Sequence, residues 1–192
     1  MILRSLVACL SLSATIVPSA VYAADTASCA KPHFSDVGWT DITATTQIAN
    51  QILMGLGYKP NITVLSVAVT FQSLENGDID VFLGNWMPLQ EPSQAPLVKA
   101  GKIDAVTSNL SDARIGFATS KAAYDAGLKT YADIARFKDQ LDGKLYGIEP
   151  GSGANGTISK MIADNTFGLT GFKLVESSER SEEHTSELQS PC

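Results

Sequence analysis

The chain has 192 residues, a formal net charge of −6 at neutral pH and 44% hydrophobic residues. This composition is typical of a globular protein, and the absence of any basic run or basic face argues against nucleic-acid binding. With only two histidines and three cysteines, the chain lacks the ligands for a zinc site and the residues for a histidine-based catalytic triad. We therefore predict no metal, no catalytic residues and no enzyme activity.

The first segment has the features of a secretory signal peptide. Arg4 supplies a positive charge, residues 5–17 are apolar, and the sequence VYA at residues 21–23 resembles a cleavage site. The apolar stretch is shorter than the about 20 residues that span a bilayer comfortably. We expect residues 1–23 to be removed on export.

Strand-like and helix-like patterns alternate from residue 33 onward. Apolar residues four apart, Ile48, Ile52 and Leu56, predict an amphipathic helix over residues 43–56 that ends at Gly57. The predicted strands are 34–37, 62–69, 79–83, 103–106, 115–118, 144–148 and 172–175. The other predicted helices are 71–76, 131–137 and 157–162, together with a helical segment that closes over 97–101. This alternation predicts an α/β fold with a largely parallel sheet.

A glycine-rich loop, GSGANG at residues 151–156, lies between a predicted strand and a predicted helix. It matches G-x-G-x-x-G, and Glu176 follows about 20 residues later, as a dinucleotide-binding fold requires. However, Glu149 and Pro150 separate the motif from the strand, and an exported protein meets little nicotinamide cofactor. We interpret the loop as a set of backbone N–H groups at a helix start, suited to a ligand oxygen. A dinucleotide-dependent enzyme is the alternative from a different functional class.

The end of the chain, residues 180–192, reads RSEEHTSELQSPC and continues no earlier pattern. It resembles the conceptual translation of a sequencing-library adapter, and a solvated acidic tail is the alternative. We therefore expect the mature protein to comprise residues 24–179 and the natural sequence to continue further. Cys29 is then the remaining cysteine of the exported part, which suggests a partner elsewhere.

Both tryptophans of the chain follow predicted strands beside a glycine. Trp39 lies in GWTD and Trp86 in GNWMPL, so in a parallel sheet both side chains reach the edge where ligands bind. The structural alternatives are that Trp86 covers the core and that Asp41 caps a helix. Two indoles and one carboxylate at one edge instead favour a site for a quaternary ammonium, which aromatic faces hold without hydrogen bonds.

Five stretches carry a resemblance to a known family: DVGWTDITATT, DIDVFLGNWMP, YDAGLKTYADIARF, LDGKLYGIEPGSGANG and GFKLVESSE. Together they resemble the periplasmic choline-binding proteins of bacterial ABC transporters, in the betaine, choline and carnitine class, over about residues 29–179. The resemblance implies a two-lobed, type II-like periplasmic binding protein with a first lobe at 24–112 and an incomplete second lobe at 113–179. It also implies a periplasmic monomer that delivers choline to a membrane permease without a cofactor.

The resemblance assigns ligand-binding residues in the first lobe. Trp39 and Trp86 match two tryptophans of the aromatic cage, and Asp41 matches the aspartate that binds the choline hydroxyl. A tyrosine of the family falls at Ile115, and Phe117 is our candidate to replace that wall.

In the second lobe, an asparagine that helps to hold the choline hydroxyl falls at Ser152, with Asn155 three residues further on. Another cage tryptophan of the family lies beyond residue 179. We predict choline as the ligand, with glycine betaine or carnitine as the alternatives within the class.

Overall fold

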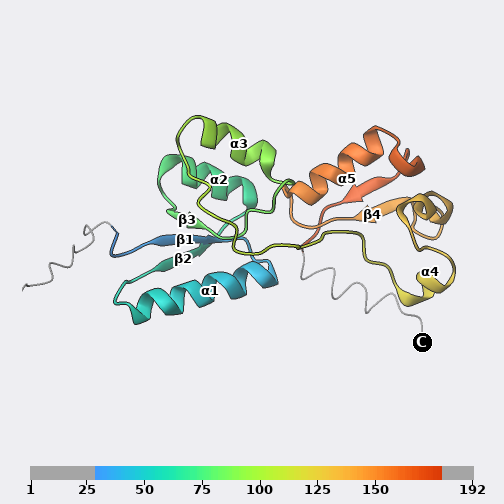
Figure 1. Ribbon diagram of the computed structural model, residues 1–192. Helices are drawn as coiled ribbons and strands as arrows, with labels where there is room; N and C mark the ends of the chain where they lie inside the picture. The colour runs from blue at the N-terminus through green and yellow to red at the C-terminus, as the bar shows by residue number, and fades with distance from the viewer. Residues whose placement is uncertain (1–28, 179–192) are drawn as a thin grey trace, which may run out of the picture.

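The computed structural model describes residues 29–178, which form an α/β fold with two small parallel sheets (Figure 1). The predicted signal peptide and the adapter-like tail lie outside these residues. The strands are β1 (His33–Asp36), β2 (Asn61–Val64), β3 (Val81–Phe82), β4 (Lys144–Tyr146) and β5 (Lys173–Val175). The α-helices are α1 (Thr40–Gly55), α2 (Val67–Asn76), α3 (Glu91–Lys99), α4 (Lys121–Asp125) and α5 (Gly153–Ala163), and the 3₁₀ helices are η1 (Tyr131–Phe137) and η2 (Thr166–Gly168). The predicted α/β class is confirmed.

The first sheet has the strand order β2-β1-β3, and both pairs are parallel. Phe34 of β1 pairs with Ile62 of β2 and with Val81 of β3. Parallel neighbours need a crossover connection, which α1 and α2 provide; α1 lies on one side of the sheet, and α2 and α3 lie on the other (Figure 1). The carboxyl ends of β1 and β3 therefore meet at the same edge of the sheet.

The second sheet pairs β4 with β5, also in parallel, with Leu145 opposite Leu174. Helix α5 is the crossover between the two strands. Each sheet has its own core. The buried residues of the first core are Val37, Trp39, Ile42, Val67 and Phe71, and those of the second are Leu128, Ile134, Leu145, Ile158, Leu169 and Phe172.

The predicted strand over residues 62–69 is wrong in its second half. Strand β2 ends at Val64, and α2 begins at Val67. The Ser66 hydroxyl accepts a hydrogen bond from Val69 N, so it caps this helix. Val67 is buried in the first core as part of the helix. The capping serine therefore divides the β-branched run, so that its first half forms β2 and its second half forms the start of α2.

Two further predicted strands are also wrong. Residues 103–106 and 115–118 form no strand in the described chain, and Val106 is 88% exposed. A short apolar tetrapeptide becomes a strand only where a neighbour supplies hydrogen bonds and a packing surface, and neither segment has such a neighbour among residues 29–178.

Two predicted helices differ from the structure in detail. The helical segment expected to close over 97–101 is α3, which begins at Glu91, ends at Lys99 and has a proline in its first turn, a position that needs no backbone donor. Helix α1 forms as expected, but its apolar stripe does not face the core. Ile48 and Ile52 are exposed, whereas Ile42 and Thr46 on another face are buried.

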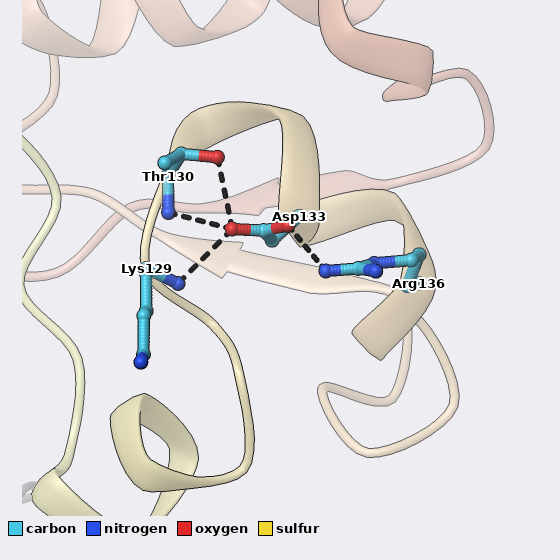
Figure 2. A network of polar contacts seen from close by, with 4 residues as sticks. All are labelled: Lys129, Thr130, Asp133 and Arg136. Carbon is cyan, nitrogen blue, oxygen red and sulfur yellow. Dashed lines mark hydrogen bonds and ion pairs between the residues drawn. The ribbon is translucent and has the colours of Figure 1, made fainter.

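A network of polar contacts begins η1 (Figure 2). The Asp133 carboxylate accepts hydrogen bonds from Thr130 Oγ1 (2.9 Å), Thr130 N (2.8 Å) and Lys129 N (3.2 Å), and it forms an ion pair with Arg136. The hydrogen bonds from Thr130, first from its hydroxyl and then from its backbone, hold the pKa of Asp133 below its ordinary value, although partial burial opposes the shift. The network stabilises the start of this helix.

Candidate functional site

A cavity of about 190 Å³ lies where the ends of the first sheet face the loop after β4. Its volume is several times the ~30 Å³ that one water occupies in the liquid. The residues that line it are Trp39, Asp41, Trp86, Leu89, Gln90, Ile115, Ile148, Ser152, Gly153 and Ala154. The cavity thus collects residues from both sheets, and four of them were predicted as ligand-binding residues.

The turn after β1 holds Trp39 in place. The buried Asp36 carboxylate accepts hydrogen bonds from Gly38 N (2.8 Å) and from Thr43 Oγ1 (2.8 Å). Gly38 has a φ of +81°, which a glycine adopts without strain. The turn places Trp39 at the N-cap of α1, where its side chain is only 7% exposed. One wall of the cavity is therefore rigidly supported from the sheet.

The indole of Trp39 also reaches across to the second sheet. Its Nε1 donates a hydrogen bond to Glu149 Oε2 at 2.7 Å. The neighbouring Ile148 packs against the first core. A buried indole N–H needs such a partner, so this bond fixes the ring while it joins the two parts of the site.

Asp41 lies in the first turn of α1, and its side chain is exposed at the rim of the cavity. It does not cap the helix, because the N-cap position is Trp39. Among the described residues, its carboxylate takes part in no hydrogen bond or ion pair. Asp41 therefore brings an uncompensated negative charge to the site.

Trp86 follows β3 and is half-buried against the first core. A side chain at Gly84 would place its Cβ 2.8 Å from the Phe82 ring and 2.9 Å from Ile42 Cγ2, so the chain passes too close to the core for any residue but glycine. The Trp86 carbonyl accepts a hydrogen bond from Gln90 N at 2.9 Å. This turn holds Trp86 at the cavity that Trp39 also lines.

The glycine-rich loop contributes Ser152, whose hydroxyl caps α5 by accepting a hydrogen bond from Asn155 N. Asn155 does not line the cavity. Its side chain instead bonds to Ile148 N (2.9 Å), Ile148 O (2.9 Å), Glu149 O (3.1 Å) and Glu176 Oε1 (3.1 Å). Asn155 therefore fastens the loop to the second sheet, and its amide is fully used there.

Phe117 also lies away from the cavity. Its ring centroid is 5.6 Å from that of Tyr131, which in turn stacks on Phe167. Ile115, where the family has a tyrosine, does line the cavity and is half exposed. The structure thus brings Trp39, Asp41, Trp86 and Ser152 together, and it leaves Phe117 and Asn155 outside that group.

Sequence reasoning missed Gln90. Its side chain lines the cavity and is 2% exposed. Nothing in the sequence marks it except its position one helical turn after Trp86, because the burial of a polar side chain depends on tertiary packing and not on local pattern.

A larger and more open hollow of about 540 Å³ lies over α3, lined by Pro88, Leu89, Glu91, Pro92, Ala95, Pro96 and Thr157. Its walls are mainly proline and aliphatic carbon, and Glu91 and Thr157 supply its polar side chains, without an aromatic ring. Binding sites combine an apolar surface with a few well-placed polar groups, which favours the smaller cavity.

Within residues 29–178, no group of His, Cys, Asp and Glu side chains is placed to hold a metal ion. Over the same residues, no helix is both long enough and apolar enough to cross a bilayer.

Comparisons with known proteins place the chain among substrate-binding proteins. Residues 33–189 match the OpuAC family, the substrate binding domain of the ABC-type glycine betaine transport system. This range includes ten residues, 180–189, of the adapter-like tail. A curated relative from Chromohalobacter salexigens, an uncharacterized protein called ORF1, is 39% identical over 127 residues, which cover 66% of this chain and 82% of the relative.

Two solved structures are similar in both sequence and fold. An ABC-transporter choline binding protein in complex with choline is 49% identical, with a TM-score of 0.82 over 85% of this chain. A choline binding protein in an unliganded semi-closed conformation is 50% identical, with a TM-score of 0.76 over 84% of this chain. The chain spans 57% and 56% of the length of these two structures, respectively.

Proposed function

The chain belongs to the OpuAC family of substrate-binding domains, and on this premise we propose that it captures choline in the periplasm for an ABC transporter permease. Membership of this family confirms the prediction of a binding protein that is not an enzyme. The alternative of a dinucleotide-dependent enzyme built on the glycine-rich loop is therefore wrong. The remaining question is which ligand the cavity holds.

The observation that carries the proposal is the meeting of two indoles and one unpaired carboxylate around a single cavity. Trp39, Trp86 and Asp41 line it together. A trimethylammonium group cannot donate hydrogen bonds, and the negative faces of aromatic rings attract it. The carboxylate of Asp41 adds charge attraction, so this set of side chains suits a quaternary ammonium better than an anion or a sugar.

Asp41 favours choline over the other members of the class. Choline carries a net positive charge and a hydroxyl that can donate to a carboxylate. Glycine betaine and carnitine carry a carboxylate, which Asp41 repels. A relative that is 49% identical and binds choline supports the same choice.

Two further observations support the proposed location in the periplasm and the proposed permease partner. The first 23 residues read as a signal peptide, and the family serves ABC-type transport. We expect the binding protein to act as a monomer that exchanges its ligand with the permease.

Titration calorimetry with choline and glycine betaine tests the proposal. Cation–π contacts contribute roughly 0.5–2 kcal/mol per ring, so Trp39→Ala and Trp86→Ala should each weaken the binding of both ligands about tenfold. Asp41→Asn should weaken choline more than glycine betaine. Asp142→Asn, at an exposed carboxylate away from the cavity, is the matched control and should bind like the parent.

Unchanged affinity in both tryptophan variants would show that the two indoles do not bind the ligand. Equal losses for choline and glycine betaine in Asp41→Asn would remove the preference for choline.

A further inference from the structure

We propose that Gln90 is a specificity-determining residue that binds the polar end of the ligand, an inference that rests on the proposed function. Gln90 lines the cavity together with Trp86 and Asp41. Its side chain is 2% exposed, and within residues 29–178 neither Nε2 nor Oε1 of its amide has a hydrogen-bond partner. A buried amide beside the candidate site is therefore unsatisfied at both of its polar atoms.

Such an arrangement is costly unless a ligand completes it. Buried polar groups in folded proteins are almost always hydrogen-bonded, and an unsatisfied one loses the free energy of its hydration without compensation. An apolar side chain of similar length, such as methionine, would fill the same space without this loss. The amide thus reduces the stability of the empty protein, which is typical of a group kept for binding rather than for folding.

The backbone fixes this amide relative to the cage. Gln90 N donates to Trp86 O at 2.9 Å, and Gln94 N donates to Gln90 O at 3.0 Å. The preceding residue, Leu89, lies against the start of α5, where a Cβ on Gly153 would come within 2.5 Å of Leu89 O. The Gln90 backbone is therefore held between the Trp86 carbonyl and α3, next to the wall that the start of α5 provides, and its side-chain amide has no hydrogen-bond partner among residues 29–178.

The chemistry of the amide matches an oxygen at the far end of the ligand from the ammonium group. A glutamine amide both donates and accepts, whereas a carboxylate such as Asp41 only accepts. The hydroxyl of choline can donate to Asp41 and accept from Gln90 Nε2. A ligand with the ammonium group alone, such as tetramethylammonium, has no oxygen atom to which the Gln90 amide could form a hydrogen bond. Gln90 should therefore separate ligands that carry an oxygen from a bare quaternary ammonium.

Gln90→Met tests this inference by calorimetry with choline and tetramethylammonium and by thermal denaturation without ligand. We expect choline to bind about tenfold more weakly, as the loss of one buried hydrogen bond implies, and tetramethylammonium to bind within about twofold of the parent. The melting temperature of the empty protein should stay equal or rise. Gln90→Leu repeats the test with a second side chain, in case one variant does not fold.

Gln94→Met is the matched control. Gln94 is also buried, one turn further along α3, but it does not line the cavity, so its variant should bind choline like the parent.

Three outcomes would overturn the inference. Unchanged choline affinity in both Gln90 variants would mean that a buried water, and not the ligand, satisfies the amide. Equal losses for choline and tetramethylammonium, with a lower melting temperature, would make Gln90 a structural residue. If the parent binds neither ligand, the proposed function fails first, and this inference fails with it.

Discussion

The two sheets contribute different groups to the same cavity. β1 and β3 lead into two indoles, a free carboxylate and the unsatisfied amide of Gln90. β4 leads into glycines, a capping serine and a loop in which Ile148 N, Ile148 O and Glu149 O are already bonded to the Asn155 side chain. The first region therefore holds the groups that recognise a ligand, and the second supplies a shaped wall. Substitutions in the first should change which ligand binds, and substitutions in the second should change how well the regions fit.

Gly153→Ala should have the largest effect, because it separates the two regions. The new Cβ would lie 2.5 Å from Leu89 O and 2.7 Å from Leu89 Cβ, and backbone at this distance cannot move without shifting the wall. We expect calorimetry to show that choline binds at least tenfold more weakly. A shifted wall would loosen the fit of the ligand against the aromatic rings, and a desolvated ring contact contributes about 2 kcal/mol.

Gly156→Ala, in the same helix, is the control. No atom lies within 4 Å of its added Cβ, so it should keep the parent affinity and stabilise the protein by about 0.5–1 kcal/mol. Parent-like affinity in Gly153→Ala would show that the regions lie further apart when the ligand is bound.

The contrast between the regions also explains what the sequence could predict. Trp39 and Trp86 could be expected to meet, because residues after neighbouring parallel strands reach one edge of the sheet. Helix α1 could be expected from its apolar spacing. These predictions depend on local patterns and on a general rule of α/β topology.

Predictions that depended on tertiary packing failed. Residues 115–118 have the composition of a strand but find no neighbour in the described chain, and no local pattern marks Gln90 as a buried residue of the cavity. The apolar stripe of Ile48 and Ile52 is exposed, and the buried face of α1 is centred on Ile42 and Thr46. Periodicity identified the helix but not the side that the sheet would cover.

Glu149→Ala should have an intermediate effect, because it removes the hydrogen bond that ties the Trp39 ring to the second region. The buried indole N–H would lose its acceptor, so we expect choline binding to weaken about threefold to tenfold. Trp39 is one of the two tryptophans of the chain, and its environment would change, so the tryptophan fluorescence emission spectrum should shift as well. Glu149→Gln keeps an acceptor oxygen and should recover most of the affinity.

A double-mutant cycle with Trp39→Phe makes this test specific, because phenylalanine keeps an aromatic face and has no N–H. Glu149→Ala should then cost much less in the Trp39→Phe background than in the parent. Equal costs in both backgrounds would mean that Glu149 acts through another contact or through its charge.

Asp133→Asn should have the smallest effect and should leave choline affinity unchanged, because no residue of the η1 network lines the cavity. The pKa of Asp133 lies below its ordinary value, chiefly because of the hydrogen bonds from Thr130. A lowered folded-state pKa stabilises the protein at pH values above the unfolded-state pKa of about 3.9. This contribution disappears as the pH falls through the folded-state pKa.

Urea unfolding at pH 7, 5 and 3 should therefore show Asp133→Asn to be less stable than the parent at pH 7 and 5, with the difference shrinking at pH 3. Asp125→Asn is the control. Within residues 29–178, Asp125 pairs only with an exposed Lys121 on α4, and exposed ion pairs of this kind contribute little, so the unfolding of Asp125→Asn should follow the parent at all three pH values. A stability difference for Asp133→Asn that stays constant from pH 7 to pH 3 would show that its carboxylate charge does not stabilise η1. A change in choline affinity would show that the second region does more than provide a wall.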